Sequence, residues 1–200
     1  MTARPLCVST ARELLMTSNA PSEALQSNTM AKAFTAEDVA AILRDHGWLG
    51  AGAEARDDSF LQEWLTRAAE LLGPYSTNRS GLLKLIFRYE ASEILKEYES
   101  QAVLARSGAR EVIRQLANLI LDGGDVDSDH FKGIVEAMKA ATPYRSRELF
   151  QPIRLALSGS SGAGELDRVI LLLDGAAKVN FAVDVKSTRQ RMLEFCAALD

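Results

Sequence analysis

Apolar side chains recur every three or four residues along most of the chain, which is the spacing of one face of an α-helix. Polar capping residues, glycines and prolines separate these apolar groups and set the expected helix ends. The predicted helices cover residues 35–47, 60–72, 79–98, 105–121, 128–142, 147–158 and 165–173. Because no alternation of strands and helices accompanies them, the sequence predicts an all-α fold.

Three of these helices carry further information. Thr35 is expected to cap the first helix, and Asp127 or Ser128 the helix that follows the glycine pair at residues 123–124. The helix over residues 79–98 is apolar around much of its circumference, which is typical of a helix covered on most sides. We therefore expect this helix to lie at the centre of the fold.

One segment near the C-terminus does not follow the helical period. Val179, Phe181, Val183 and Val185 alternate with other residues, which is the spacing of a strand. A lone strand would have no partner here, so the alternatives are a helix with Phe181 and Val185 on one face or an extended segment. After this segment, Ser187 is expected to cap a last helix.

The beginning of the chain differs from the rest in composition. Residues 1–34 are rich in Ser, Thr, Asn and Ala, and such a segment cannot bury enough surface to offset the entropy of ordering. We expect a flexible leader there, or the tail of a linker from an upstream domain. The remainder is expected to divide into a helical subdomain, residues 35–142, and a smaller one, residues 143–200.

The overall composition is that of an ordinary globular protein, with 47% hydrophobic and 25% charged residues. There is no run of 18 apolar residues, and the N-terminus lacks the apolar core of a secretory signal, so no membrane span and no export are expected. Cys7 and Cys196 form no CxxC motif. We expect two free thiols in a reducing cytoplasm rather than a disulfide or a metal site.

The charge is unevenly distributed along the chain. A net charge of −4 argues against a protein that coats nucleic acid indiscriminately. Residues 1–143 carry 15 Lys and Arg against 20 Asp and Glu, whereas residues 144–191 carry 8 against 5. The second range is therefore positive by three charges, either by chance on solvated helix faces or because it meets an anion.

Catalytic and cofactor motifs are missing from the sequence. His46 and His130 are far apart and fit no metal-ligand spacing. The glycine-rich residues 159–164 follow a helix and lack the lysine of a nucleotide loop. The acidic residues 122–129 fit the EF-hand pattern in neither register, because the glycine at the turn is missing. We therefore predict no catalytic residue, no metal and no cofactor.

The most informative stretch is residues 147–166, RELFQPIRLALSGSSGAGEL. It places Arg154 in an apolar helical phrase, followed by small residues that leave the backbone open to close approach. Pro152 is expected near the start of the helix, where its missing N–H costs nothing. An arginine kept between apolar residues and a Gly/Ser loop indicates a specific role for its side chain.

This phrase resembles the C-terminal anticodon-binding region of bacterial glutamyl-tRNA synthetases, whose signature is approximately G-K-x-x-F-x-P-x-R-x-A-x-T/S-G. The matching positions are Phe150, Pro152, Arg154, Ala156, Ser158 and Gly159. The likeness extends more weakly over residues 35–179. It implies an all-α, multi-helix anticodon-binding domain of the class I aminoacyl-tRNA synthetases, a helical cage or bundle with two subdomains.

The resemblance implies a non-catalytic module that binds the anticodon loop of a tRNA. RNA readers grip unstacked bases, and a guanidinium can stack on a base or present paired donors to its edge. The implied RNA-binding residues are Arg154 at the anticodon pocket, Arg145 and Arg147 at phosphates, Ser158 and Gly159 in the loop, and Leu166 as an apolar contact. A buried arginine that satisfies helix carbonyls or a carboxylate is the alternative for Arg154.

Departures from the family leave other functions open. Glu165 stands where family members commonly have proline or glycine, and its charge would repel RNA. The HxGH and Lys-Met-Ser-Lys-Ser signatures of the catalytic domain are absent from the sequence, so the resemblance implies a domain that either stands alone or is separated from the catalytic part of a glutamate–tRNA ligase. The alternatives are a divergent paralogue that binds a protein, such as a separate catalytic domain, instead of RNA, and an unrecognised enzyme.

Overall fold

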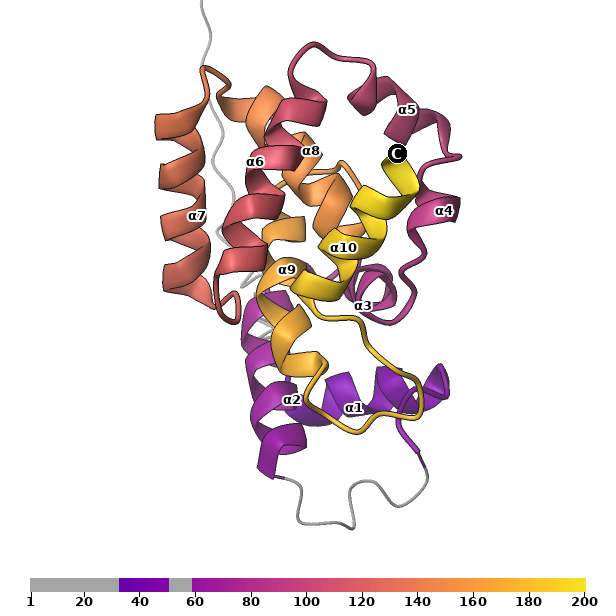
Figure 1. The fold of residues 1–200 in the computed structure, drawn as a ribbon. Coiled ribbons are helices and arrows are strands. Elements are labelled where there is room, and N and C mark those ends of the chain that lie inside the picture. Colours follow the sequence, from indigo (N-terminus) through magenta and orange to yellow (C-terminus); the bar gives the residue numbers. More distant parts are fainter. Residues whose placement is uncertain (1–32, 51–58) are drawn as a thin grey trace, which may run out of the picture. The chain divides into compact units, whose positions relative to one another are not determined.

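The computed structural model describes residues 33–50 and 59–200, and every regular element in this part of the chain is a helix, which confirms the all-α prediction. No helix within these residues is long and apolar enough to cross a membrane. Residues 1–32 of the predicted leader, with Cys7, lie outside the described residues, whereas Cys196 is a free thiol. The helices in Figure 1 are α1 (Ala36–Asp45), α2 (Ser59–Leu72), α3 (Arg79–Phe87), α4 (Ala91–Ile94), α5 (Tyr98–Leu104), α6 (Ala109–Asp122), α7 (Ser128–Ala141), α8 (Ser146–Ser158), α9 (Glu165–Ala176) and α10 (Thr188–Leu199).

Three helices begin with the side-chain caps that the sequence predicts. Thr35 and Asp38 form a reciprocal capping box at α1, and Ser187 forms another at α10. The carboxylate of Asp127 accepts hydrogen bonds from the N–H groups of His130 at 2.8 Å and Asp129 at 3.0 Å. These bonds, that of His130 first, hold the pKa of Asp127 below its ordinary value. The acidic loop therefore supplies a helix cap, as its sequence indicates.

The expectation of one continuous helix over residues 79–98 is wrong. The helix stops at Phe87, Arg88 and Glu90 adopt extended or irregular conformations, and a separate short helix, α4, follows. The physical reason lies elsewhere in the chain. Arg191 of α10 donates hydrogen bonds to the carbonyls of Leu85 and Ile86, which would otherwise continue the helical ladder.

Two other helix starts differ from the sequence prediction. The fourth predicted helix begins at Ala109 rather than at residue 105, because Gly108 has a φ of +87° and a Cβ there would lie 2.0 Å from the Tyr144 ring. Helix α8 begins at Ser146, so Pro152 lies inside the helix and not near its start. Its missing N–H leaves the carbonyl of Glu148, an exposed residue, without a helical donor.

The apolar side chains form two cores, and α9 contributes to both. The first core joins α1, α2 and α3 to Leu166, Val169, Leu172 and Leu173 of α9. The second core contains side chains of α4, α5, α6, α7, α8 and α10, together with Ile170 and Leu171 of α9. Helix α9 packs against α2, α3 and α8 and takes the central place expected for residues 79–98 (Figure 1). The division into residues 35–142 and 143–200 stays a prediction, and each core draws side chains from both ranges.

Residues 178–186 form no helix and no strand but an irregular segment, with a turn at Lys178 and bends at Val179, Ala182 and Val183, so the helical alternative is wrong. Val179, Phe181 and Val185 are buried in the first core, and the N–H of Ala182 donates to the carbonyl of Trp48 at 2.8 Å. The ring of Phe181 meets the rings of Trp64 and Phe87 edge-on, with centroids 5.1 Å and 4.9 Å away. The alternating period therefore reflects side chains that enter the core from an irregular segment and not from a strand.

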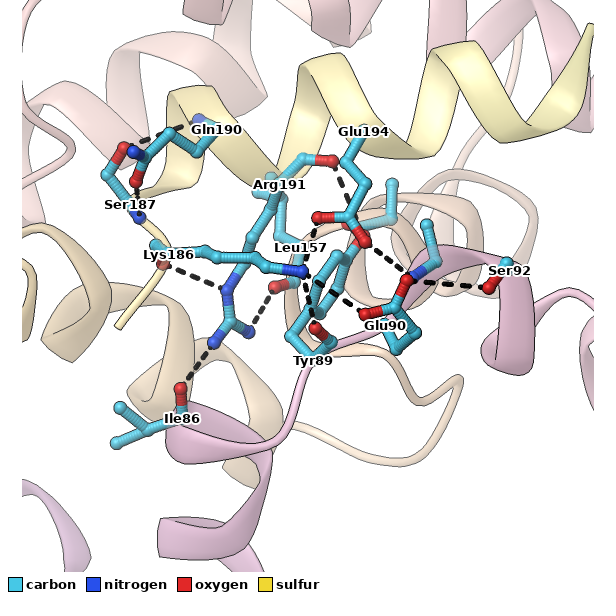
Figure 2. A network of polar contacts seen from close by, with 12 residues as sticks. Ile86, Tyr89, Glu90, Ser92, Leu157, Lys186, Ser187, Gln190, Arg191 and Glu194 are labelled. Carbon is cyan, nitrogen blue, oxygen red and sulfur yellow. Dashed lines mark hydrogen bonds and ion pairs between the residues drawn. The ribbon is translucent and has the colours of Figure 1, made fainter. Parts of the chain in front are cut away.

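A fully buried arginine, Arg191, joins the ends of several elements (Figure 2). Its guanidinium lies 4.5 Å from the centroid of the Tyr89 ring, and burial lowers the pKa of Arg191 to about 10, so it stays charged at neutral pH. It donates hydrogen bonds to the backbone carbonyls of Leu85 at 3.0 Å, Ile86 at 2.6 Å, Leu157 at 2.9 Å and Lys186 at 3.1 Å. Helices α3, α8 and α10 are therefore held at one point.

Glu194 completes this network at the surface (Figure 2). Its carboxylate accepts from the Ala91 N–H at 2.9 Å and pairs with Lys186 at 2.6 Å. Burial alone would raise the pKa of Glu194, but the hydrogen bonds from Lys186 and Ala91, with the charges of Lys186 and Arg191, lower it below 4.5. A lowered carboxyl pKa stabilises the folded state above the unfolded pKa, and this contribution is lost as the pH falls through the folded value.

We therefore expect the free energy of unfolding to fall as the pH drops below about 4.5, partly through Glu194. The variant Glu194→Gln should be less stable at neutral pH and should lose less stability on acidification. Urea unfolding of both proteins at neutral pH and between about pH 5 and 3 measures this difference. Glu97→Gln, at an exposed position, serves as the matched control. Parallel pH profiles for the parent and Glu194→Gln would contradict the assignment.

Candidate nucleic-acid interface

The loop between α8 and α9 is the stretch that the sequence singles out, and it begins at a left-handed glycine. Gly159 has a φ of +80°, and its N–H donates to the carbonyl of Leu155 at 3.1 Å to end α8. A Cβ at this position would come within 2.8 Å of the Ile94 side chain, so only glycine fits without movement. Beyond it, residues 162–164 are exposed to solvent.

Arg154 of α8 bonds both to the loop and to the first turn of α9. Its Nε and Nη2 atoms donate to the two carboxylate oxygens of Asp167 at 2.7 Å and 2.9 Å, and Nη1 donates to the carbonyl of Gly162 at 3.2 Å. The guanidinium also lies 5.1 Å from the centroid of the Phe150 ring. Its side chain is 14% exposed. The alternative for Arg154, an arginine bonded to a carboxylate, therefore describes its contacts in this structure.

These contacts leave part of the guanidinium available. They use the Nε–H and one N–H of each Nη atom, so one N–H remains on Nη1 and one on Nη2. A Cβ at Gly164, in the exposed part of the loop, would lie 4.0 Å from Nη2. The free donors thus lie near the exposed loop rather than deep in a core.

Gln151, one turn before Arg154, makes a second set of contacts with the loop. Its side-chain N–H donates to the carbonyl of Ser161 at 3.2 Å. Its side-chain oxygen accepts from Arg147 at 3.0 Å and also from Arg106. Gln151 therefore joins the loop to two positively charged side chains.

Arg145 and Arg147, the predicted phosphate contacts, are both exposed at the start of α8. Arg145 donates to the carbonyls of Thr142 and Tyr144, each at 2.7 Å. Ser146 between the two arginines has a φ of +46°, a conformation that non-glycine residues rarely adopt. Together with Arg106, these side chains place positive charge at one end of α8.

Two of the implied contact residues cannot offer their side chains to RNA. Ser158 is 1% exposed, and its hydroxyl donates to the carbonyls of Arg154 at 2.8 Å and Ser160 at 3.3 Å. Leu166 is 3% exposed because the first turn of α9 directs it into the first core. In this structure Leu166 packs in the first core, and Ser158 bonds the backbone at the start of the loop, so their contacts with RNA stay predictions.

A hollow of about 530 Å³ opens beside the loop, and we call it the α7–α9 hollow. Phe131 and Leu171 are buried at its base, whereas Lys132 and Arg168 are exposed at its rim. Glu165 and Asp167 add two carboxylates to the same wall. The full lining is Tyr75, Ser128, Phe131, Lys132, Gly164, Glu165, Asp167, Arg168 and Leu171.

Most of this lining was not predicted from the sequence. Tyr75 follows α2 and Lys132 lies on α7, so neither is near the signature phrase, and no local pattern marks them. The sequence gives one signal for Asp167 as the partner of Arg154. It is a carboxylate close after the loop, and it precedes the apolar residues 169–173. The two histidines play no part here. His46 contacts Ser80 at 3.0 Å and His130 contacts the carbonyl of Asp125 at 2.9 Å.

Comparison with known proteins agrees with the resemblance in the signature phrase. The model of a family described as the anticodon binding domain matches residues 25–177. No solved structure shows a significant match to the chain.

Three curated relatives illustrate the sequence similarity. Glutamate–tRNA ligase 2 of Syntrophus aciditrophicus (strain SB) is 28% identical over 110 residues, which are 55% of this chain and 23% of that protein. Glutamate–tRNA ligase of Bacillus subtilis (strain 168) is 26% identical over 112 residues, 56% of this chain and 23% of that protein. The enzyme of the same name from Bacillus velezensis is 24% identical over 150 residues, 73% of this chain and 30% of that protein. The chain thus spans less than a third of each of these relatives.

Proposed function

The chain belongs to the anticodon-binding domain family, and from this premise we propose that it binds the anticodon loop of a tRNA through the α8–α9 loop and the α7–α9 hollow. The relatives carry the name glutamate–tRNA ligase, which makes a tRNA with a glutamate or glutamine anticodon the first candidate. The matched region is an anticodon-binding domain, so we assign tRNA binding to these residues.

The observation that carries this proposal is the position of the hollow next to an exposed small-residue backbone. Sequence-specific RNA recognition uses unstacked bases, which need an apolar cavity, an aromatic or planar stacking surface and nearby polar groups. The α7–α9 hollow has Tyr75 and Phe131 as aromatic residues and a volume of about 530 Å³. Residues 162–164 at its edge present backbone groups without side chains that would block a base.

The charges around the α7–α9 hollow favour one orientation of a bound nucleotide. Lys132 and Arg168 at the rim can attract phosphates, and Arg145 and Arg147 extend the positive charge along α8. Glu165 and Asp167 would repel a phosphate but accept hydrogen bonds from a base amino group. The base rather than the phosphate therefore faces this wall. We propose Arg154 as the residue that positions the loop and that offers its two remaining N–H groups to the RNA.

Fluorescence anisotropy with a labelled anticodon stem-loop tests this function. A stem-loop with a glutamate anticodon should bind more tightly than one with the same stem and an altered anticodon. The affinity should fall with salt, and Arg145→Gln or Arg147→Gln should each reduce the slope of log K against log salt by about 0.7. Lys96→Gln removes the same charge from the α4–α5 region and should leave the slope unchanged.

The contrary outcomes are clear for this experiment. Equal binding of both stem-loops would show an electrostatic interaction without base recognition. No binding of either stem-loop at low salt would refute the proposed function. A salt slope that changes as much in Lys96→Gln as in the α8 variants would remove these arginines from the interface.

A further inference from the structure

A second hollow lies farther along α9, and we call it the α2–α9 hollow. It has a volume of about 220 Å³ and is bordered by α2, the loop before α7 and the C-terminal half of α9. Phe60, Trp64, Val126 and Leu171 form its apolar walls. Leu171 also lines the α7–α9 hollow, whereas every other lining residue differs. Its chemistry can therefore be considered separately from the proposed RNA site.

The most unusual side chain at this hollow is Phe60. It is 61% exposed although the other apolar side chains of α2 enter the first core. The indole of Trp64 is buried behind it and donates to the carbonyl of Leu172 at 3.0 Å. A Cβ at Gly175 would lie 3.1 Å from the Trp64 ring, so glycine allows the indole to pack closely against α9. An exposed ring thus stands at the entrance of a preformed apolar recess.

The charged groups around the recess are predominantly negative. Its lining has four carboxylates, those of Glu63, Asp125, Asp127 and Asp174, against the two cations of Arg67 and Lys178, which leaves two negative charges in excess. Lys178 is already paired with Asp125, and Arg67 lies close enough to Asp127 to favour its ionised form. Within the described part of the chain, no cation is bonded to Glu63 or Asp174.

Asp174 is a carboxylate held at the base of this hollow without a bonded counter-ion. It is 7% exposed and accepts hydrogen bonds from the N–H of Val126 at 2.7 Å and from the N–H of Thr188 at 2.8 Å. The Thr188 hydroxyl donates to both of its oxygens. These donors are uncharged, so the carboxylate keeps its negative charge at the lining of the recess, where it also acts on Lys178. A cation entering the hollow would gain from that charge in a poorly hydrated environment.

We propose that the α2–α9 hollow is a docking site for an arginine side chain presented by a partner protein. A guanidinium can stack on the exposed Phe60 ring and donate paired hydrogen bonds to Glu63, so it matches both features at the entrance. The volume of about 220 Å³ is below the roughly 300–1,000 Å³ typical of small-molecule pockets, which favours a single side chain. Arginine and aromatic residues are also the usual anchors of protein interfaces.

RNA is the less suitable occupant of this second hollow. The two excess negative charges oppose a phosphate backbone, and the carboxylate of Asp174 would have to face it in an apolar recess. The two hollows along α9 therefore favour partners of opposite charge. This inference does not depend on whether the α7–α9 hollow binds an anticodon loop.

The test is a titration of the ¹⁵N-labelled full chain with a blocked Gly-Arg-Gly peptide, followed by NMR. The chain has two tryptophans, so the indole N–H of Trp64 reports on the hollow and that of Trp48, buried against Phe87, serves as the internal reference. We expect the Trp64 signal to shift with half-saturation at about 1 mM, as a single side chain provides only weak affinity. A peptide with citrulline, the neutral analogue, should give no comparable shift.

Variants on the surface make the result specific. Phe60→Ala and Glu63→Gln should each weaken peptide binding about two- to fivefold, because each removes one of the two contacts of the guanidinium. Glu99→Gln on α5, an exposed residue away from the hollow, should bind as the parent does.

Three results would overturn this proposal. They are an unshifted Trp64 signal up to ~20 mM peptide, an equal shift with the citrulline peptide, or a Trp64 shift caused by the anticodon stem-loop and not by the peptide. Loss of RNA binding alone, with the arginine-dependent shift intact, would refute the proposed RNA function but leave the docking site standing.

Discussion

Replacing Arg191 with methionine should lower the free energy of unfolding by about 3–5 kcal/mol, the largest stability effect that we expect in this chain. Methionine fills much of the same length but donates no hydrogen bond. The carbonyls of Leu85, Ile86, Leu157 and Lys186 would lose the donors that they now have, and those of Ile86 and Leu157 are bonded in a buried environment. Because folded domains are stable by only about 5–15 kcal/mol, this loss would be a large part of the total.

Urea unfolding of the parent and the variant measures this loss. Arg189→Met, two residues earlier on α10, is the matched control, since Arg189 is exposed and makes a single contact with the carbonyl of Leu121. Its effect should stay within about 0.5 kcal/mol. If Arg191→Met does not fold, Arg191→Lys retains the charge and should show an intermediate loss. A loss of less than about 1 kcal/mol in Arg191→Met would show that water replaces the guanidinium at these carbonyls.

Replacing Arg154 with alanine should weaken binding of the glutamate-anticodon stem-loop at least tenfold, or about 1.4 kcal/mol. The substitution removes the bonds to Asp167 and Gly162 that hold the loop, and also the two N–H groups available to RNA. Arg154→Lys should restore little of the affinity, because a single ammonium cannot bond both oxygens of Asp167 and the Gly162 carbonyl in the same geometry. Dissociation constants at constant salt measure the effect.

A second variant separates the two contributions of Arg154. Asp167→Ala removes the anchor of the guanidinium but leaves its donors in place. A loss equal to that of Arg154→Ala would assign the effect to the position of the loop, whereas a smaller loss would assign part of it to direct contact. Lys96→Ala, on the α4–α5 segment, is the control for charge alone. Unchanged binding in Arg154→Ala would remove this residue from the interface.

The sequence predicts those features that depend on neighbouring residues. The caps at Thr35, Asp127 and Ser187 are correct because a capping side chain bonds to N–H groups two or three residues further on. The helical character and the all-α class follow from the spacing of apolar residues for the same reason. The sequence also places Arg154 correctly beside the loop of small residues, because both lie in one continuous stretch of the chain.

Features that depend on distant contacts were not predictable in this way. The end of α3 is set by Arg191, which lies 106 residues after Leu85 in the sequence. The start of α6 depends on the ring of Tyr144 against Gly108. The path of residues 178–186 depends on the first core, which α1, α2, α3 and α9 form together.

The candidate interface shows the same limit. Local reasoning places Arg154 at a pocket, but it does not reveal that Asp167 already bonds the guanidinium. It assigns Leu166 to a ligand contact, whereas the first turn of α9 directs that side chain into the first core. The α7–α9 hollow combines residues that follow α2, begin α7 and begin α9, so its existence depends on how these three segments pack.

The contribution of α9 to both cores has a consequence for how the described helices lose their structure. Unfolding of either core would remove the apolar contacts along one face of α9, which is twelve residues long and also packs in the other core. Helices α1 to α10 should therefore denature in a single cooperative transition rather than in two stages. A fragment cut between residues 142 and 143 would leave α1 to α3 without the leucines that close their core, and it would be prone to aggregate.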